Sequence, residues 1–444
     1  STPSNSSAAS DVYKRQIIFM YNSQIKEKAL LVTIKLKSER NNWRMEDIAE
    51  ELEELTTTSR AEIVDNITCF LEKPTPTFFI GRGKAEEIAL IADELEAGTV
   101  VFSRDLSGTQ QRNLEEILNK KTIDRTQLIL DIFARHAHSP EGKMQVELAQ
   151  LQYLLPRLSG KGIVLSRLGG GIGTRGPGEQ KLEVDRRRIR KRIDKLKSDL
   201  KDFTQHRLTI KKKRKEKAIP NIALVGYTNA GKSTLLNTLT KAGQIVAESM
   251  FTTLDPVSKS LVLPGKDRIV ISDTVGFLSD LPHHLIEAFR ATLEVVIDAD
   301  LLIHVLDVSH PRIYERNSAV LSVLKELGAG EKPIITALNK IDSLEDKIWL
   351  DKIKRDFINP IAISAKFGEN IPELLRQIEN NFSTRMNYLE LSIPHSRMDL
   401  VDLFYREGRV KQIEYLQEGI KVKLKLPRIL SDKLLHSKEI KKIN

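Results

Sequence analysis

The sequence predicts a multidomain α/β protein: an N-terminal α/β domain with a long helical hairpin, a doubly wound α/β domain and a small C-terminal α+β domain. Strand-like apolar runs alternate with amphipathic helical runs in two separate regions, which is typical of parallel sheets covered by helices. Apolar residues at heptad spacing lie between those regions and indicate paired helices. The 444 residues are enough for about three domains of ~150 residues.

The composition is that of a folded protein without membrane spans. Hydrophobic residues make up 40% and charged residues 29% of the chain. The most apolar stretch, Val295–Val308, contains three aspartates and a histidine and therefore cannot cross a bilayer. The single cysteine, Cys69, cannot form an internal disulfide, which is typical of a reducing cytosol. These features exclude transporters and channels, and we expect a cytoplasmic monomer, located in part at the membrane periphery.

The first 140 residues divide into a leader and a domain. Residues 1–19 are low in complexity, so we interpret them as a non-native or disordered leader, with Met20 as the true start. Residues 20–140 form the predicted N-terminal α/β domain. Its strands are expected at Ala29–Ile34, Ala61–Phe70 and Thr99–Phe102. Its helices are expected at Met45–Leu55, Lys84–Leu95 and Gln110–Leu118, the last capped by Ser107 or Thr109.

Residues 141–218 are predicted to form an antiparallel helical hairpin. Apolar residues recur at heptad spacing in two runs, from Met144 to Leu158 and from Leu182 to Phe203. Between them, residues 160–178 hold 8 of the 23 glycines, which is typical of an exposed loop at the tip of a hairpin. Pro156 is expected to kink the first arm.

Strand–helix alternation returns in residues 219–382, which we interpret as the doubly wound domain. Its strands are expected at Asn221–Val225, Arg268–Ser272, Leu301–Val308, Pro333–Leu338 and Ile361–Ile363. Residues 383–444 form the predicted α+β domain, whose last dozen residues are polar and expected to fray. Its elements are expected at Tyr388–Ile393 (strand), Met398–Tyr405 (helix), Val410–Tyr415 (strand) and Ile420–Lys425 (strand).

A complete Walker A motif, which identifies a P-loop domain, follows the first of these strands. The backbone amides of such a loop surround the phosphates, while Lys232 reaches the β- and γ-oxygens and Ser233 is a ligand of Mg²⁺. The residues expected to bind nucleotide here are Gly226, Tyr227, Thr228, Asn229, Ala230, Gly231, Lys232, Ser233 and Thr234.

Two further motifs follow in the order typical of a GTPase. An Asp-x-x-Gly turn ends a strand; Asp273 is expected to hold the metal through water and the Gly276 amide to contact the γ-phosphate. A polar turn before it supplies the predicted switch threonine, Thr253. The nucleotide-binding residues in these motifs are Phe251, Thr252, Thr253, Asp273, Thr274, Val275 and Gly276. The predicted metal ligands are Ser233, Thr253 and Asp273, and the predicted catalytic residues are Lys232, Thr253 and Gly276.

The choice of base is indicated by the run from Asn339 through Lys340 to Asp342. Asp342 offers two acceptors to the N1–H and N2 amine of guanine, whereas adenine lacks that donor pair and would leave the carboxylate unpaired. Ser364 and Ala365 are expected to close the base pocket. The motifs together predict a P-loop GTPase that binds GTP and GDP; an ATP-dependent enzyme would instead be stabilised by ADP.

The residue after the Asp-x-x-Gly turn differs from that of a self-sufficient hydrolase. Ras-like GTPases have a glutamine there to orient the attacking water, whereas Phe277 cannot hydrogen-bond to water. We therefore expect slow turnover that needs a partner or an ion. Asn229 resembles the asparagine of potassium-activated GTPases, in which K⁺ takes the role of an arginine finger; the alternative is that Asn229 serves the loop geometry alone.

One segment carries the positive charge of the chain. Residues 181–218 contain 17 Lys and Arg against 6 Asp and Glu, whereas the whole chain has a net charge of +10. A solvated helix face is one interpretation, but so large an excess favours a polyanion, and the glycine-rich loop suits a structured RNA. The predicted RNA contacts are Arg167, Arg175, Arg186, Arg187, Arg188, Arg190, Lys191 and Arg192.

Four stretches together resemble the HflX family of ribosome-associated GTPases, and the resemblance covers roughly residues 26–444. These stretches are Thr77–Gly83, Met144–Leu151, Gly169–Glu179 and Gly226–Ser233. The resemblance implies a partner, the large (50S) ribosomal subunit, whose rRNA would contact residues 169–178 and 186–192. It also implies ribosome-stimulated hydrolysis and ribosome splitting or recycling under stress. The alternative is an RNA-binding assembly or remodelling factor that uses GTP hydrolysis as a timer.

Overall fold

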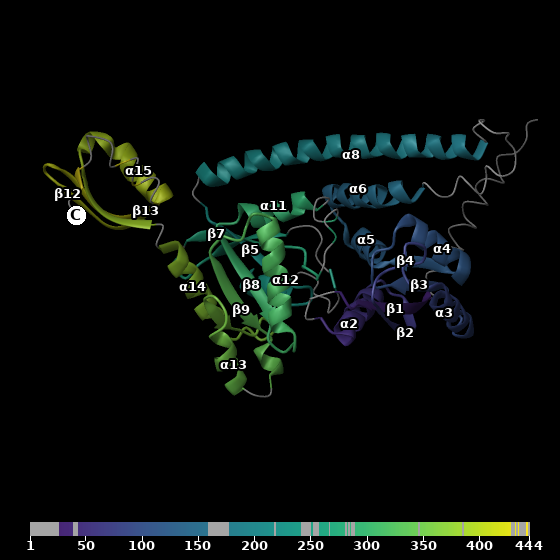
Figure 1. Ribbon diagram of the computed structural model, residues 1–444. Helices are drawn as coiled ribbons and strands as arrows, with labels where there is room; N and C mark the ends of the chain where they lie inside the picture. The colour runs from purple at the N-terminus through teal and green to yellow at the C-terminus, as the bar shows by residue number, and fades with distance from the viewer. Residues whose placement is uncertain are drawn as a thin grey trace, which may run out of the picture. The chain divides into compact units, whose positions relative to one another are not determined.

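The computed structural model describes most of the chain (Figure 1). The described residues are 26–38, 43–158, 177–216, 219–240, 250–251, 257–265, 267–279, 282, 285, 289–344, 347–383, 386–427, 431, 434 and 441–442. They form two compact units. The first comprises the described residues of Ser1–Leu200, Ala247–Leu254 and Pro282–Phe289, and the second those of Lys201–Val246, Asp255–Leu281 and Arg290–Asn444.

The first unit contains a four-stranded parallel sheet in the order β2-β1-β3-β4 (Figure 1). Its strands are β1 (Lys28–Leu36), β2 (Glu62–Leu71), β3 (Thr99–Phe102) and β4 (Lys121–Asp124). Its helices are α2 (Met45–Thr58), α3 (Arg82–Glu94), α4 (Gly108–Leu118) and α5 (Arg125–His136). The Ser107 hydroxyl accepts a hydrogen bond from the Gln110 amide and caps α4.

The sequence did not predict β4 and α5. The strand has only four residues, and α5 begins at the residue directly after it, so no turn residues in the sequence separate the two elements.

The long helix α8 (Pro177–Glu216) packs against α6 (Pro140–Arg157), which runs in the opposite direction (Figure 1). Leu148, Ile193 and Leu196 are buried together along the predicted heptad seam. The 40 residues of α8 span about 60 Å at 1.5 Å per residue. Pro156 is the last but one residue of α6, and the kink expected there stays a prediction. Residues 160–176 of the predicted tip lie outside the described residues.

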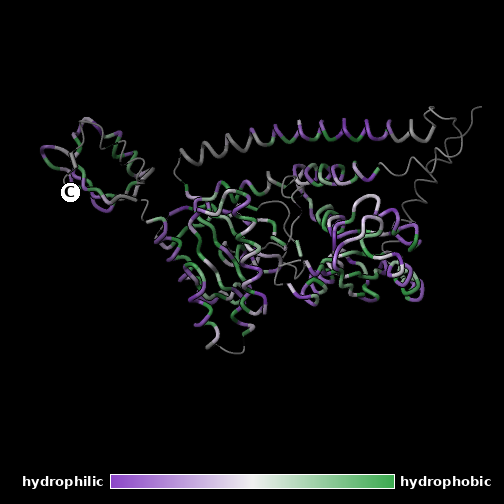
Figure 2. Tube along the Cα trace, viewed as in Figure 1, coloured by the Kyte–Doolittle hydropathy of each residue, from purple (hydrophilic) through white to green (hydrophobic). Residues whose placement is uncertain are grey.

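The second unit contains a six-stranded sheet in the order β10-β9-β8-β5-β7-β6, parallel except for β6. Figure 2 shows the strands of this sheet as largely hydrophobic. The strands are β5 (Asn221–Gly226), β6 (Ser258–Val262), β7 (Arg268–Asp273), β8 (Leu301–Asp307), β9 (Ile334–Asn339) and β10 (Pro360–Ala362). The helices are α9 (Lys232–Thr240), α11 (Arg290–Asp298), α12 (Ile313–Glu326), α13 (Lys347–Lys354) and α14 (Ile371–Ser383). The sequence did not predict β6 because this edge strand is polar and mostly exposed.

The C-terminal part of the second unit is an antiparallel sheet in the order β12-β13-β11-β14, packed with helix α15 (Met398–Glu407). Its strands are β11 (Met386–Ile393), β12 (Arg409–Leu416), β13 (Gly419–Pro427) and β14 (Lys441–Lys442). The pairing of β14 with Leu391 and Ser392 corrects the expectation that the last residues fray throughout. In the described part of the chain, no helix is long and apolar enough to cross a bilayer.

Candidate nucleotide-binding site

The phosphate loop (residues 226–233) lies at the carboxyl end of β5, where parallel α/β sheets bind their ligands. Two of its positions have no room for a side chain. A Cβ on Gly226 would lie 2.3 Å from the Val305 carbonyl oxygen. Gly231 has a φ of +94°, and a Cβ there would lie 2.3 Å from Asn339 Nδ2. The two Walker glycines therefore let the loop pass close to its neighbours.

Lys232 provides a buried positive charge in this loop. Its side chain is 6% exposed, and its ammonium donates hydrogen bonds to the carbonyl oxygens of Gly226 (3.1 Å) and Tyr227 (2.8 Å). Burial lowers the pKa of Lys232 to about 8, although the Asp273 carboxylate opposes this change. The group therefore remains largely cationic at neutral pH, as phosphate recognition requires.

Two of the three predicted metal ligands lie together. The Ser233 hydroxyl donates a hydrogen bond of 2.5 Å to Asp273 Oδ2, and the other carboxylate oxygen accepts one from the Thr274 amide at 2.9 Å. Asp273 is completely buried at the end of β7. A hydroxyl and a carboxylate are hard oxygen ligands of the kind that Mg²⁺ prefers, so these residues fit the ion. Thr252 and Thr253 lie outside the described residues.

The Asp-x-x-Gly turn lies against the phosphate loop. The Thr274 hydroxyl donates to the Leu224 carbonyl oxygen at 2.7 Å. A Cβ on Gly276 would lie 2.8 Å from Thr228 Cα and 3.1 Å from Lys232 Nζ, so only glycine fits so close to the lysine. Val275 is buried. The turn predicted to contact the γ-phosphate therefore lies next to Lys232, which is predicted to bind the β- and γ-phosphates.

The guanine motif is tied to the phosphate loop by Asn339. Its amide nitrogen donates to the Ala230 carbonyl oxygen (2.8 Å), and its amide oxygen accepts from the Ala365 amide (2.9 Å). The Ser364 hydroxyl donates to Asp342 Oδ1 at 2.6 Å and orients that exposed carboxylate. The structure thus brings the predicted base-binding segments to the loop.

A residue with no predicted role also belongs to this region. Asp307 ends β8 as Asp273 ends β7, and its carboxylate forms an ion pair with Lys340 at 2.6 Å. The position of Asp307 at the carboxyl end of an apolar strand was the feature of the sequence that could have indicated a place in this site.

Two polar groups near the loop have no hydrogen-bond partner among the described residues: Thr228 Oγ1 and His304 Nε2. His304 is buried on β8 beside Val225. Burial and the nearby Lys232 cation lower the pKa of His304 to about 3, so this imidazole is neutral. Lys232, and not His304, is therefore the positively charged side chain of this pair.

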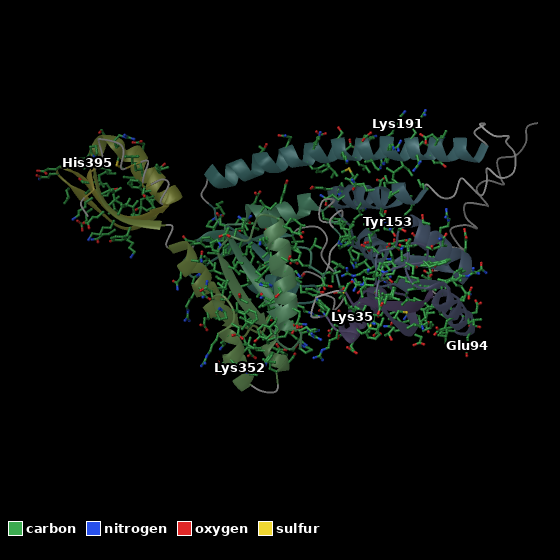
Figure 3. All side chains as sticks on the ribbon, in the orientation of Figure 1. Lys35, Glu94, Tyr153, Lys191, Lys352 and His395 are labelled. Carbon is green, nitrogen blue, oxygen red and sulfur yellow. The ribbon has the colours of Figure 1, made fainter. Side chains whose placement is uncertain are left out.

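The predicted RNA contacts on α8 are mostly exposed. Figure 3 shows Lys191 on the side of α8 away from α6. Arg187, Arg188 and Arg190 are also exposed, whereas Arg186 is half-buried. Arg192 forms a two-pronged ion pair with Glu147 of α6, at 2.6 Å for each bond, and so stabilises the helix pair. The predicted contacts Arg167 and Arg175 lie outside the described residues.

Comparisons with known proteins cover most of the chain. Three family models match: GTP-binding GTPase N-terminal (residues 46–134), GTP-binding GTPase Middle Region (136–214) and 50S ribosome-binding GTPase (221–340). A GTPase HflX from Caldanaerobacter subterraneus subsp. tengcongensis is 44% identical over 409 residues, which cover 92% of this chain and 93% of that protein. The GTPase HflX of Escherichia coli K12 is 40% identical over 401 residues, covering 90% and 93%.

The similar solved structures include a GTP-binding protein from the archaeon Sulfolobus solfataricus in complex with GDP. It is 26% identical, with a TM-score of 0.43, and the match covers 80% of this chain and 98% of that one. The identity and coverage of the curated relatives establish the family: the chain belongs to the HflX family of GTPases.

Proposed function

We propose that the protein binds and hydrolyses GTP with Mg²⁺, and that the nucleotide controls the binding of α8 to rRNA of the large (50S) ribosomal subunit. Through this cycle it would promote ribosome splitting or recycling under stress in the cytoplasm. The observation that carries the proposal is the convergence of Lys232, the Ser233–Asp273 pair and Asn339 on one phosphate loop. The match to the 50S ribosome-binding GTPase model and the charge of α8 support the ribosomal partner.

The phosphate groups would be held by the amides of the phosphate loop and by the buried Lys232 cation. Ser233 and Asp273, with Thr253 as the third proposed ligand, would hold Mg²⁺. When bound, this ion neutralises charge on the β- and γ-phosphates. The Gly276 amide, next to Lys232, would contact the γ-phosphate. Because Lys232, Ser233 and Asp273 are held by internal hydrogen bonds, they are preorganised for the charge of the transition state.

The attacking water must be oriented by a group other than the side chain of Phe277. That side chain is 2% exposed and packed in the core, so it does not reach solvent. Asn229 is exposed and has a φ of 59°, a left-handed conformation that asparagine adopts readily, which supports the loop-geometry interpretation. Turnover in K⁺ compared with Na⁺ separates the two roles of Asn229. A partner that supplies the missing group would raise a slow basal rate.

Aromatic contacts within the first unit support coupling between nucleotide and hairpin. Phe133 of α5 packs edge-to-face against Phe251 and Phe289, with ring centroids 4.6 Å and 4.7 Å apart. The Met250 amide also donates to the Thr58 hydroxyl at 3.2 Å. Phe251 immediately precedes the proposed switch threonine segment. A rearrangement of that segment on GTP binding would therefore act on the N-terminal domain that carries α6.

Two measurements test this function. GTP hydrolysis should be slow for the protein alone and faster with purified large subunits. Sedimentation of whole ribosomes with a non-hydrolysable GTP analogue should then yield free subunits. Ribosomes that bind the protein but stay intact would favour an assembly or remodelling factor over a splitting factor. Hydrolysis and subunit binding that are both absent would contradict the proposal.

A further inference from the structure

We propose that Tyr227 is a positioning residue for GTP hydrolysis, which fixes the segment Phe277–Ser279 against the phosphate loop through its hydroxyl. The inference rests on the GTP hydrolysis proposed above. Tyr227 belongs to the Walker motif, yet its side chain is only 2% exposed and points into the protein core rather than to solvent. Its role is therefore different from that of the loop residues whose amides face the phosphates.

The environment of the Tyr227 ring comes from two other elements. Its hydroxyl accepts a hydrogen bond of 2.9 Å from the Ser279 amide. The Arg316 guanidinium of α12 lies over the ring, 4.8 Å from the centroid. A phenol held on one face by a cation and at its oxygen by a backbone amide has a fixed orientation. Tyr227 therefore joins the phosphate loop to the segment after the Asp-x-x-Gly turn.

Two backbone hydrogen bonds join the same segments. The Thr228 amide donates to the Phe277 carbonyl oxygen (2.9 Å), and the Phe277 amide donates to the Gly226 carbonyl oxygen (3.1 Å). They form a short parallel bridge between Tyr227 and Phe277. Of the three bonds, only the one to the Tyr227 hydroxyl depends on a side chain. The hydrogen bond to this hydroxyl is therefore the one that requires a tyrosine at position 227.

The Tyr227 hydrogen bond bears on GTP hydrolysis because Gly276 directly precedes the segment 277–279. A Cβ on Gly276 would already be 3.1 Å from Lys232 Nζ, so the turn has little room to move toward the loop. Loss of the Tyr227 bond would release the Ser279 amide and leave only the two backbone bonds of Phe277 to hold the segment that follows the Gly276 amide. Small displacements of a positioned group reduce catalytic rates strongly. The buried side chain of Phe277 has no polar group that could replace the lost side-chain bond.

The test is the variant Tyr227→Phe, which keeps the ring and its contact with Arg316 and removes only the oxygen. We expect kcat for GTP to fall about 3- to 10-fold, with KM and the Kd for GDP within about twofold of wild type. Hydrogen exchange at residues 277–279 should become faster. The matched control is Tyr314→Phe, because Tyr314 is another tyrosine of the same unit, and its hydroxyl donates to Asp356 at 2.7 Å. This control should leave kcat unchanged.

A value of kcat within twofold of wild type, with unchanged exchange at residues 277–279, would overturn the inference. Thermal unfolding of each variant identifies a folding defect. Should Tyr227→Phe be unstable, Arg316→Gln provides the second test, with a smaller decrease in kcat expected because the cation over the ring is lost. A wild-type protein without GTP hydrolysis, with or without large subunits, would contradict the proposed function instead, and the exchange measurement would still test the Tyr227 bond by itself.

Discussion

The phosphate loop and helix α8 both present positive charge, but they hold it in opposite ways. Lys232 is 6% exposed and donates to two carbonyl oxygens of its own loop. The Arg188 side chain is 78% exposed and forms a long ion pair of 3.7 Å with Asp185 of the same helix. A buried cation with fixed partners has one orientation and acts on a ligand of defined shape. Exposed cations on a helix suit a long polyanion, whose binding depends on charge and salt.

The two regions should therefore respond differently to substitution. Changes in the phosphate loop should alter nucleotide binding and chemistry whether or not a ribosome is present. Changes on α8 should alter subunit binding and leave the chemistry of the isolated protein unaffected.

The largest effect should follow Lys232→Ala. Removal of the buried cation leaves the β- and γ-phosphate charge without its main counter-charge, and we expect kcat/KM for GTP to fall about 100- to 1,000-fold. The control is Lys354→Ala on α13, because that lysine is half-exposed and forms an ion pair with Asp351 of the same helix. Steady-state hydrolysis measures both variants. A decrease of less than tenfold for Lys232→Ala would show that this lysine does not bind the phosphates.

Asp342→Asn should change the base that is recognised. One carboxylate acceptor becomes an amide donor, which opposes the N2 amine of guanine and matches the 2-oxo group of xanthine. We expect the affinity for GDP to fall at least about tenfold and that for xanthosine diphosphate to rise. Calorimetric titration with both nucleotides measures the exchange. Unchanged preference for GDP would place the guanine site elsewhere.

Alkaline pH should weaken nucleotide binding without any substitution. The pKa of Lys232 is lowered to about 8, so the cation is present below pH 8 and is lost as the pH rises through 8. The affinity for GDP should fall about tenfold between pH 7 and pH 9. The contribution of Lys232 to the free energy of unfolding should increase over this range, because the unfolded chain binds that proton more strongly. Lys232→Arg should abolish the pH dependence of binding; its persistence would assign it to another group.

The smallest effect is expected for Phe133→Leu. The change removes two edge-to-face contacts from the first unit and should reduce its free energy of unfolding by about 1 to 2 kcal/mol. It should also reduce the difference in large-subunit affinity between the GTP-analogue and GDP states. Phe70→Leu is the matched control, because Phe70 is 66% exposed on β2 of the same unit. An unchanged nucleotide dependence in Phe133→Leu would exclude this contact from the coupling.

The sequence predicted the fold where local patterns are strong. Heptad spacing located the α6–α8 seam, and apolar runs located the central strands of both parallel sheets. It failed where the pattern depends on tertiary contacts. The four-residue strand β4, the edge strand β6 and the terminal strand β14 are short or polar, and only pairing with their neighbours makes them strands.

The candidate site shows the same division. Motif spacing identified Lys232, Ser233 and Asp273, because the chemistry of phosphate and metal demands those residue types at those positions. The same spacing predicts that Tyr227 contacts the nucleotide, and this stays a prediction; the spacing did not indicate that the Tyr227 hydroxyl accepts a hydrogen bond from the Ser279 amide. The direction of a side chain from a loop is decided by what packs around it, here α12 and the segment after the turn. The sequence does not record such packing.

The most direct test is binding of the large subunit by a protein in which the exposed basic residues of α8 are neutralised to glutamine. The substituted residues are Arg187, Arg188, Arg190 and Lys191. The matched control neutralises four basic residues of the second unit, Lys325, Lys352, Lys354 and Arg355. With the GTP analogue bound and folding verified, we expect the α8 variant to lose most of its affinity for the subunit. The slope of log affinity against log salt concentration should become shallower by about 3. Basal hydrolysis should be unchanged. Subunit affinity and salt dependence equal to those of wild type and control would contradict a cationic helix that binds rRNA.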